Sequence, residues 1–370
     1  MNRRLAIATA VTVALLLGAC GDDDSSGTAT TTPASAAGAA PTTAPAASAG
    51  SVTLVTYESW PDTLDEVLAE FTTQTGIDVK VVKAGDTGTM VQKAVLTAGN
   101  PEGDVMFGVD NTFLSEVVAG KVFDPYTAPG VADLPKELTS LVPGGEATPI
   151  DVGDVCINVD SAWFDEHELA PPADLDALAD PAYKDLLVVE NPASSSPGLA
   201  FLLATIVKYG DDGWVDYWTR LRANGVQVVD TWTDAYYGAF SGGGDGTKPI
   251  VVSYASSPPA EVVFADPPID KATTASVDST CFRQVEFAGV LRGTSRAAEA
   301  RRLVDFMLTS SFQSALPLNL FVYPADSRIA LPEVFTANAT VPAAPATMDP
   351  ATIGANRQTW LDTWTDTVLR

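Results

Sequence analysis

Short apolar runs alternate with helix-like segments in the first half of the chain, and a polar or aromatic residue follows each run. The first three runs are residues 52–56, 77–82 and 104–109. Tyr57, Asp86 and Asp110 come after them, in that order. Such alternation is typical of a parallel sheet covered by helices, in which all strands end at one edge. The pattern therefore predicts an α/β fold that brings these three side chains to one edge of a sheet.

A second region of the same kind follows a longer run, residues 149–160, which we interpret as a crossing between two domains. Its first predicted strand, residues 186–190, is followed by a serine-rich loop and by a helix that begins at Pro197. Residues 284–290 are predicted to return as another strand. The chain after its first fifty residues is long enough for one large or two ordinary α/β domains.

Two aromatic residues follow neighbouring apolar runs in this second region. Trp232 comes after residues 226–229, where Thr231 can cap a helix, and Tyr254 comes after residues 249–252. Because the chain that leaves a parallel strand builds the ligand crevice, the two rings are predicted to meet at one rim. Flat rings beside small hydroxyl residues suit a flat, partly cationic ligand. The alternative, that both rings belong to the core, stays open at this point.

The N-terminal fifty residues read as an export signal followed by a spacer. Arg3 and Arg4 precede an apolar run that is too short to span a membrane, so residues 1–19 are predicted to be a signal peptide. The run ends in Leu-Gly-Ala before Cys20, which resembles the lipobox of bacterial lipoproteins and implies a lipid on Cys20. Residues 20–50 are then a lipidated cysteine and a disordered tether. We expect an exported protein, lipid-anchored to the outer face of the cell membrane; a plain signal peptide is the alternative.

Charge and missing motifs favour binding over catalysis. A formal net charge of −26 argues against a nucleic-acid partner. The sequence has no P-loop, no GxSxG and no HExxH, and its single histidine, His167, lies in a charged run. Hydrolase triads and most zinc sites need a histidine. We therefore expect a binding protein rather than an enzyme, with no metal and no cofactor.

Several segments after residue 50 resemble, in the same order, the thiamine-binding proteins of bacterial ABC importers. They are residues 56–60, 108–111, 149–160, 195–199, 232–236, 253–258, 284–286 and 322–324. The resemblance implies a two-lobed α/β fold of the type II periplasmic-binding-protein kind, each lobe a mostly parallel sheet flanked by helices and joined by crossing hinge strands. It assigns residues 51–152 plus 286–370 to lobe 1 and residues 153–285 to lobe 2.

The resemblance also implies a monomeric protein that captures thiamine, or its phosphates, between the lobes and delivers it to an importer permease. The candidate thiamine-binding residues are Tyr57, Asp86, Thr87, Asp110, Ser195, Ser196, Trp232, Tyr254, Ala255, Ser256, Ser257 and Phe321. Thiamine carries a permanent thiazolium cation, which aromatic faces attract. Ser195 and Ser196, at a helix N-terminus, are expected to receive the hydroxyethyl end or its phosphate. Phe321 stands where the family has Trp, and Ala260 where it has Tyr, so the aromatic enclosure is expected to be reduced.

Two further functions and the state of two cysteines stay open. Tyr236 and Tyr237 form an adjacent pair of the kind that ferric-binding proteins use, and Cys156 could serve a thiaminase-like enzyme as a nucleophile. Cys156 and Cys281 are the only cysteines after Cys20, and both flank the segments that cross between lobes by resemblance. Adjacent strands lie within disulfide range, so a bridge is predicted; two buried free thiols are the alternative.

Overall fold

The structure, a computed structural model, describes residues 50–370. The predicted signal peptide, the lipidated Cys20 and the tether through residue 49 lie outside the described residues. No helix in the described part of the chain combines the length and apolar character that crossing a bilayer requires.

One sheet of ten strands runs through the described residues, in the order β2-β1-β3-β9-β5-β8-β6-β7, with β10 paired to β5 and β4 paired to β9. The strands are β1 (Gly50–Thr56), β2 (Ile77–Lys83), β3 (Val105–Asp110), β4 (Phe123–Asp124), β5 (Thr148–Asp160), β6 (Leu187–Glu190), β7 (Gln227–Val229), β8 (Ile250–Tyr254), β9 (Thr274–Leu291) and β10 (Tyr323–Pro324).

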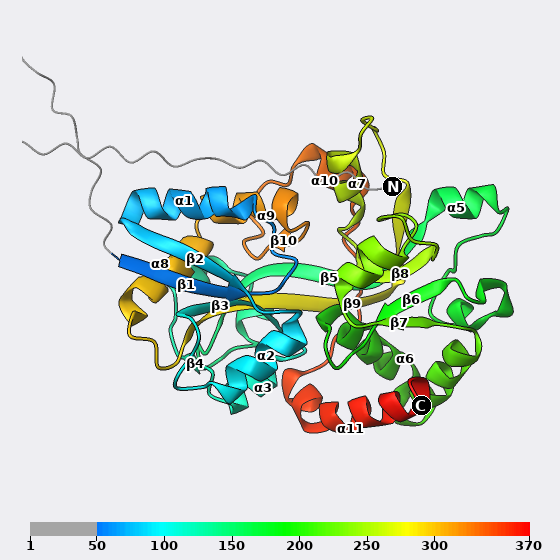
Figure 1. Ribbon diagram of the computed structural model, residues 1–370, viewed down its shortest axis with the longest axis horizontal. Helices are drawn as coiled ribbons and strands as arrows, with labels where there is room; N and C mark the ends of the chain where they lie inside the picture. The colour runs from blue at the N-terminus through cyan, green and yellow to red at the C-terminus, as the bar shows by residue number, and fades with distance from the viewer. Residues whose placement is uncertain (1–49) are drawn as a thin grey trace, which may run out of the picture. The chain divides into compact units, whose positions relative to one another are not determined.

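Two parallel parts of this sheet are connected by a pair of long antiparallel strands. β1 pairs in parallel with β2 and β3, and β6 pairs in parallel with β7 and β8. Between them, β5 and β9 pair with each other along most of their length and run side by side through the middle of Figure 1. The mostly parallel sheets and the crossing strands are thus as predicted. Both long strands continue without a break through the proposed lobe boundaries, so the division at those residues stays a prediction.

Helices cover both faces of the sheet (Figure 1). They are α1 (Leu64–Thr75), α2 (Thr87–Leu96), α3 (Leu114–Ala119), α4 (Lys136–Thr139), α5 (Ser161–Glu166), α6 (Ser196–Ala223), α7 (Pro258–Phe264), α8 (Ala297–Met307), α9 (Ser310–Asn319), α10 (Glu333–Asn338) and α11 (Pro350–Val368). Short 3-10 turns are η1 (Pro129–Asp133), η2 (Ala177–Ala179) and η3 (Pro181–Tyr183), and η4 (Asp234–Ala239) is a π-helix.

Alternation along the strands divides the core between the two faces. Val52 and Leu54 of β1 pack with α1, α8 and α9, whereas Val55 packs with α2 and α3 on the opposite side. Successive strand residues point to opposite faces, so a strand covered on both faces reads as a continuous apolar run. In the same part of the core as Val55, Trp218 of α6 meets Trp364 of α11 edge to face, with 5.5 Å between ring centroids.

The two cysteines link the crossing strands. Cys156 of β5 and Cys281 of β9 form a disulfide, with an S–S distance of 1.98 Å and 4.1 Å between Cα atoms. The bridge is buried and packs against Ala255, the first residue after β8. A disulfide thus connects the strands that join the two parallel parts of the sheet, next to the segment that carries Ser256 and Ser257.

Candidate functional site

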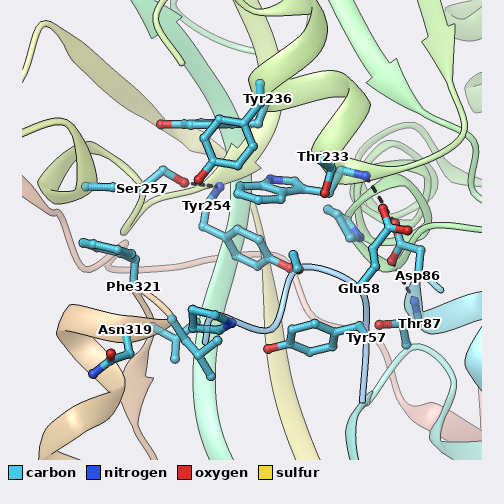
Figure 2. Close-up of a pocket in the computed structure, with 18 of the residues that line it drawn as sticks. Tyr57, Glu58, Asp86, Thr87, Thr233, Tyr236, Tyr254, Ser257, Asn319 and Phe321 are labelled. Atoms are coloured by element: carbon cyan, nitrogen blue, oxygen red, sulfur yellow. Dashed lines mark hydrogen bonds between the residues drawn. The ribbon is translucent and has the colours of Figure 1, made fainter. Parts of the chain in front are cut away.

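A cavity of about 320 Å³ lies where β1, β8 and the helix-start loops converge. This volume falls within the range of small-molecule sites in proteins. The candidate residues that line the cavity are Tyr57, Asp86, Thr87, Trp232, Tyr254, Ser257 and Phe321. The structure therefore brings together side chains from distant parts of the sequence, as the strand-end argument predicts (Figure 2).

Trp232 forms the centre of an aromatic wall. One face of its indole stacks on Tyr236, with 5.0 Å between ring centroids and 17° between planes. Tyr254 lies 6.4 Å from the indole at a tilt of 58°, so the two predicted rim residues meet. Trp232 and these tyrosines all line the cavity, so a flat ligand can pack against this aromatic wall.

Hydrogen bonds fix the orientation of that wall. The Trp232 indole N–H donates to Ser253 Oγ at 3.0 Å, and Ser253 Oγ lies 2.9 Å from Ser257 Oγ. Ser257 Oγ also accepts from the Tyr254 backbone N–H at 3.2 Å, which is drawn in Figure 2. Ser257 therefore connects both rings, and Ser253, which sequence reasoning did not select, holds the indole in place.

The segment that carries the wall is locally unusual. Thr231 Oγ1 accepts from the Asp234 N–H at 3.1 Å, as expected of a helix cap. The helix then widens into the π-helix η4, and Phe240 leaves it to form a bridge with Lys248. π-helical turns are rare in proteins overall, but those that occur are often found at functional sites. No sequence pattern predicted this one.

Two glycines in the sheet make room for the tyrosines. A side chain at Gly108 of β3 would overlap the ring of Tyr57, and a Cβ at Gly153 of β5 would lie 3.0 Å from the ring of Tyr254. Gly108 also has φ of 96°, a conformation that other residues rarely adopt. Both rings thus pack directly on strand backbone at the cavity floor.

Aromatic residues also face the cavity from its other side. Phe321 and Asn319 lie opposite Asp86 and Glu58 in Figure 2. Phe321 has φ of 54°, and such strain in a non-glycine residue is typical of functional sites. Its ring meets Phe264 of α7 at 5.6 Å. Phe264 lies one helical turn after Ala260, so it supplies a ring on the helix where the resemblance implied a loss.

Carboxylates gather at the cavity as well. Asp86 caps α2 by accepting the Thr87 N–H at 2.7 Å, and it accepts the Trp232 backbone N–H at 3.2 Å. Burial raises the pKa of Asp86 to about 6, although these two hydrogen bonds oppose the shift. Glu286 of β9 accepts the Tyr57 hydroxyl at 3.3 Å. Burial, and then the neighbouring Asp151, raise the pKa of Glu286 well above its usual value.

Five candidate residues are buried behind the cavity wall rather than in it: Asp110, Ser195, Ser196, Ala255 and Ser256. Asp110 accepts from Thr112 N–H and Oγ1 at 2.7 and 2.6 Å, from Gln284 Nε2 at 2.9 Å, and from the Ser196 hydroxyl. The Ser196 hydroxyl, expected to meet a ligand, is therefore committed to a carboxylate. Ala255 packs on the disulfide instead.

Sequence reasoning missed several residues of the wall, among them Glu58, Phe264, Glu286 and Asn319. Tyr236 and Tyr237 had been considered only as iron ligands. Glu286 had a usable signal, because it and Gln284 alternate within an apolar run and so point to one face of a strand. Phe264 and Asn319 had none: each is the last residue of a helix, and its position at the cavity follows from tertiary packing.

The two alternative functions depend on residues whose surroundings are now defined. Tyr236 is buried, and Tyr237 meets it edge to face at 5.3 Å. Burial raises the pKa of both phenols, which disfavours the phenolate that ferric iron prefers. Cys156 is bound in a disulfide and does not line the cavity, so it presents no thiol there.

Comparison with known proteins agrees with this geometry. The family model for bacterial extracellular solute-binding proteins matches residues 100–349. The thiamine-binding periplasmic protein of Salmonella typhimurium is 28% identical over 334 residues, which cover 88% of this chain and 96% of that protein. The solved structure of a periplasmic thiamin binding protein has a TM-score of 0.75 and 25% identity, covering 86% of this chain and 96% of that one.

Iron-bound HitA from Pseudomonas aeruginosa shares the fold alone, with a TM-score of 0.67 and 19% identity over 86% of this chain and 99% of that one.

A continuous sheet with two crossing strands and an aromatic cavity beside them defines a protein of the periplasmic-binding class. The chain belongs to the bacterial extracellular solute-binding proteins, whose model covers most of its described residues.

Proposed function

We propose that this chain captures thiamine in the aromatic cavity and delivers it to the permease of an ABC importer. The main observation in support of the proposal is the aromatic wall around Trp232. The indole is stacked on Tyr236 from behind, fixed by Ser253, and placed in one cavity with the carboxylates of Asp86 and Glu286. A flat cation fits this arrangement, because the ring face and the carboxylates attract the same charge.

The ligand's two rings match different parts of the wall. The thiazolium is proposed to lie against the ring of Trp232, where the attraction needs no proton transfer. Asp86 is proposed to act by its charge or to accept an aminopyrimidine N–H. Asp110, Ser195, Ser196, Ala255 and Ser256 are proposed to support the wall from behind. The binding is proposed to involve no chemical change in the ligand.

The cellular setting belongs to the same proposal. The relatives named above are periplasmic binding proteins, which supports export and a role in transport. We propose further that residues 1–19 are removed, that Cys20 carries lipid, and that a monomer with lobes at residues 51–152 plus 286–370 and 153–285 closes on the ligand.

Calorimetric titration with thiamine tests the function. We expect saturable binding at one site per chain, and mass spectrometry of the folded protein as purified is expected to detect co-purified thiamine. Absence of both would contradict the proposal. Addition of ferric citrate distinguishes the iron alternative, because tyrosine phenolates on ferric iron absorb visible light. Thiamine breakdown products after long incubation would support an enzyme instead.

A further inference from the structure

Gly88, in the first turn of α2, touches the other parallel part of the sheet. α2 follows β2, in the part formed by β1, β2 and β3, whereas residues 191–195 follow β6, in the part formed by β6, β7 and β8. The Gly88 N–H donates to the Ser194 carbonyl oxygen at 2.9 Å. A Cβ at Gly88 would lie 2.5 Å from that oxygen and 2.8 Å from the carbonyl oxygen of Ala193. The two backbones therefore approach more closely than a side chain at residue 88 allows.

A second hydrogen bond connects the two parts at the same place. Asp86, two residues before Gly88, accepts the Trp232 backbone N–H at 3.2 Å. Figure 2 shows Asp86 beside Thr233, the residue that follows Trp232. Asp86 and Trp232 both line the cavity, each from a different parallel part. The contact at Gly88 thus lies next to the seam where the two halves of the cavity meet.

Residues 191–195 are fixed to their own part of the sheet. The Ser194 hydroxyl donates to the Asp230 carbonyl oxygen at 2.6 Å, and the Asn191 N–H donates to the Val229 carbonyl oxygen of β7 at 2.7 Å. Displacement of the Ser194 backbone would break these bonds. The segment that Gly88 touches is therefore a rigid surface.

The first turn of α2 is fixed to the opposite part in the same way. Thr87 Oγ1 donates to the Gly108 carbonyl oxygen of β3 at 3.1 Å, and Met90 and Val91 are buried in the core. Two fixed backbones thus meet at Gly88, while β5 and β9 join the parts elsewhere. A side chain added at residue 88 is therefore relieved by movement of one parallel part against the other.

From these contacts we propose that Gly88 is a positioning residue for ligand capture, because its missing side chain lets the two halves of the cavity approach closely enough to enclose the ligand. The inference rests on the proposed function. Gly88 does not line the cavity, so it acts through Asp86 and Trp232. Separation of the two halves, through which a ligand leaves, breaks the bonds of Gly88 and Asp86 to the other part. These bonds therefore slow dissociation.

Stopped-flow titration of the full protein with thiamine, followed by tryptophan fluorescence, is the test. For Gly88→Ala we expect thiamine to dissociate about tenfold faster and to associate within about twofold of the native rate. Gly88→Val, with a larger side chain, is expected to have a larger effect. Gly213→Ala in α6 is the matched control, since its added methyl group meets Tyr209 Cβ of the same helix at 3.1 Å. Its dissociation rate is expected to be native.

A Gly88→Ala protein that is folded by thermal melting and releases thiamine at the native rate would overturn the proposal and leave the proposed function standing. Ser194→Ala is the second variant, used if the Gly88 variants do not fold. It removes the bond from the Ser194 hydroxyl to Asp230, and we expect dissociation about threefold faster because the surface for Gly88 is loosened. A native rate in that variant would overturn the proposal as well.

Amide hydrogen exchange tests the contact without a ligand. We expect the peptides that contain residues 88 and 232 to exchange about fivefold faster in Gly88→Ala than in the native protein, and at the native rate in Gly213→Ala. Failure of the native protein to bind thiamine would contradict the proposed function. The exchange rates would then decide the role of Gly88, and equal rates in all three proteins would overturn it.

Discussion

Trp232 is the side chain on which the proposed recognition depends most. It is held by three neighbours that serve different purposes: Tyr236 stacks behind it, Ser253 fixes its N–H, and Tyr254 meets it at the rim. A side chain fixed in this way loses little freedom when a ligand arrives, so more of the contact energy is available for binding.

We expect Trp232→Ala to weaken thiamine binding about thirtyfold, which corresponds to about 2 kcal/mol from the lost ring face and cation–π attraction. Trp232→Phe keeps a smaller ring and is expected to retain part of the affinity. Because Trp232 is only half-buried, the melting temperature of the free protein is expected to change little. Calorimetry on the three proteins measures the effect, and unchanged affinity in folded Trp232→Ala would contradict the site.

The raised pKa of Asp86 predicts how thiamine binding depends on pH. Its pKa in the free protein is raised to about 6, first by burial, with Glu58 adding to the shift. The buried acids Glu190 and Glu286 also interact with Asp86. A bound cation favours the ionised carboxylate, so the pKa falls in the complex and binding releases protons. The affinity is therefore expected to rise as pH increases through about 6 and to level off above it.

Asp86→Asn is the comparison for that pH profile. Asparagine caps helices as well as aspartate does, so α2 is expected to keep its N-terminus. The ligand's own titration is common to both proteins and cancels in the comparison. A profile with the same slope between pH 5 and pH 7 in both proteins, measured by calorimetry, would show that Asp86 does not titrate on binding.

Individual residues differed in how well the sequence revealed them. Tyr57, Asp86, Trp232 and Tyr254 could be selected because each follows a strand that its apolar run defines. Ser196 was placed correctly at a helix start, but its direction depends on Asp110, which lies 86 residues away in sequence. Contacts of this kind follow from tertiary packing, which local patterns do not encode.

At the scale of elements, β9 shows what local patterns miss. The sequence predicted a strand at residues 284–290, whereas β9 extends from Thr274 to Leu291. Residues 275–279 are mostly polar and partly exposed, so they read as a loop. They become a strand because β5 pairs with them, from Val159–Ala275 to Ile157–Val277. The partner strand, not the local sequence, determines the extension.

The disulfide between β5 and β9 is expected to stabilise this pairing. It closes a sequence separation of 125 residues, for which chain entropy gives roughly 5 kcal/mol. We expect full reduction to lower the melting temperature by roughly 5–15 °C. The double variant Cys156→Ala with Cys281→Ala is expected to melt at a similarly low temperature and not to respond to reductant.

The thiamine affinity of this variant shows whether the disulfide only stabilises the fold or is also needed for binding. Because the bridge lies along the crossing strands and outside the cavity wall, the double alanine variant is expected to bind thiamine within about threefold of the native protein. Non-reducing peptide mapping checks the bond directly. Two free thiols in the exported protein, or an unchanged melting temperature after full reduction, would contradict its stabilising role.

At the scale of the whole molecule, the sequence revealed the class and the order of elements, because strands and helices alternate with clear apolar runs. It did not reveal that the parallel parts form one continuous sheet, since strand pairing across β5 and β9 joins distant segments. The resemblance predicted candidate residues from both parallel parts, but the contributions of Phe264 of α7 and Asn319 of α9 to the cavity were not predicted. A ligand in this cavity would contact side chains from both parallel parts of the sheet at once.

The last prediction concerns the N-terminal segment, and it depends on sequence alone because residue 20 lies outside the described residues. We expect Cys20→Ala to move the protein from the membrane pellet to the soluble fraction, since the anchor would be a lipid attached at that residue. Ser25→Ala, in the same tether, is the matched control and is expected to stay in the pellet. The mass of the N-terminal peptide is read in the same samples, so that a leader retained by the variant is recognised. Thiamine affinity is expected to be unchanged in both variants, because the proposed cavity is built only from residues 57–322. Native protein whose N-terminal Cys20 peptide carries no lipid mass, or a processed variant that stays in the pellet after a salt wash, would contradict the lipid anchor and leave the proposed binding function intact.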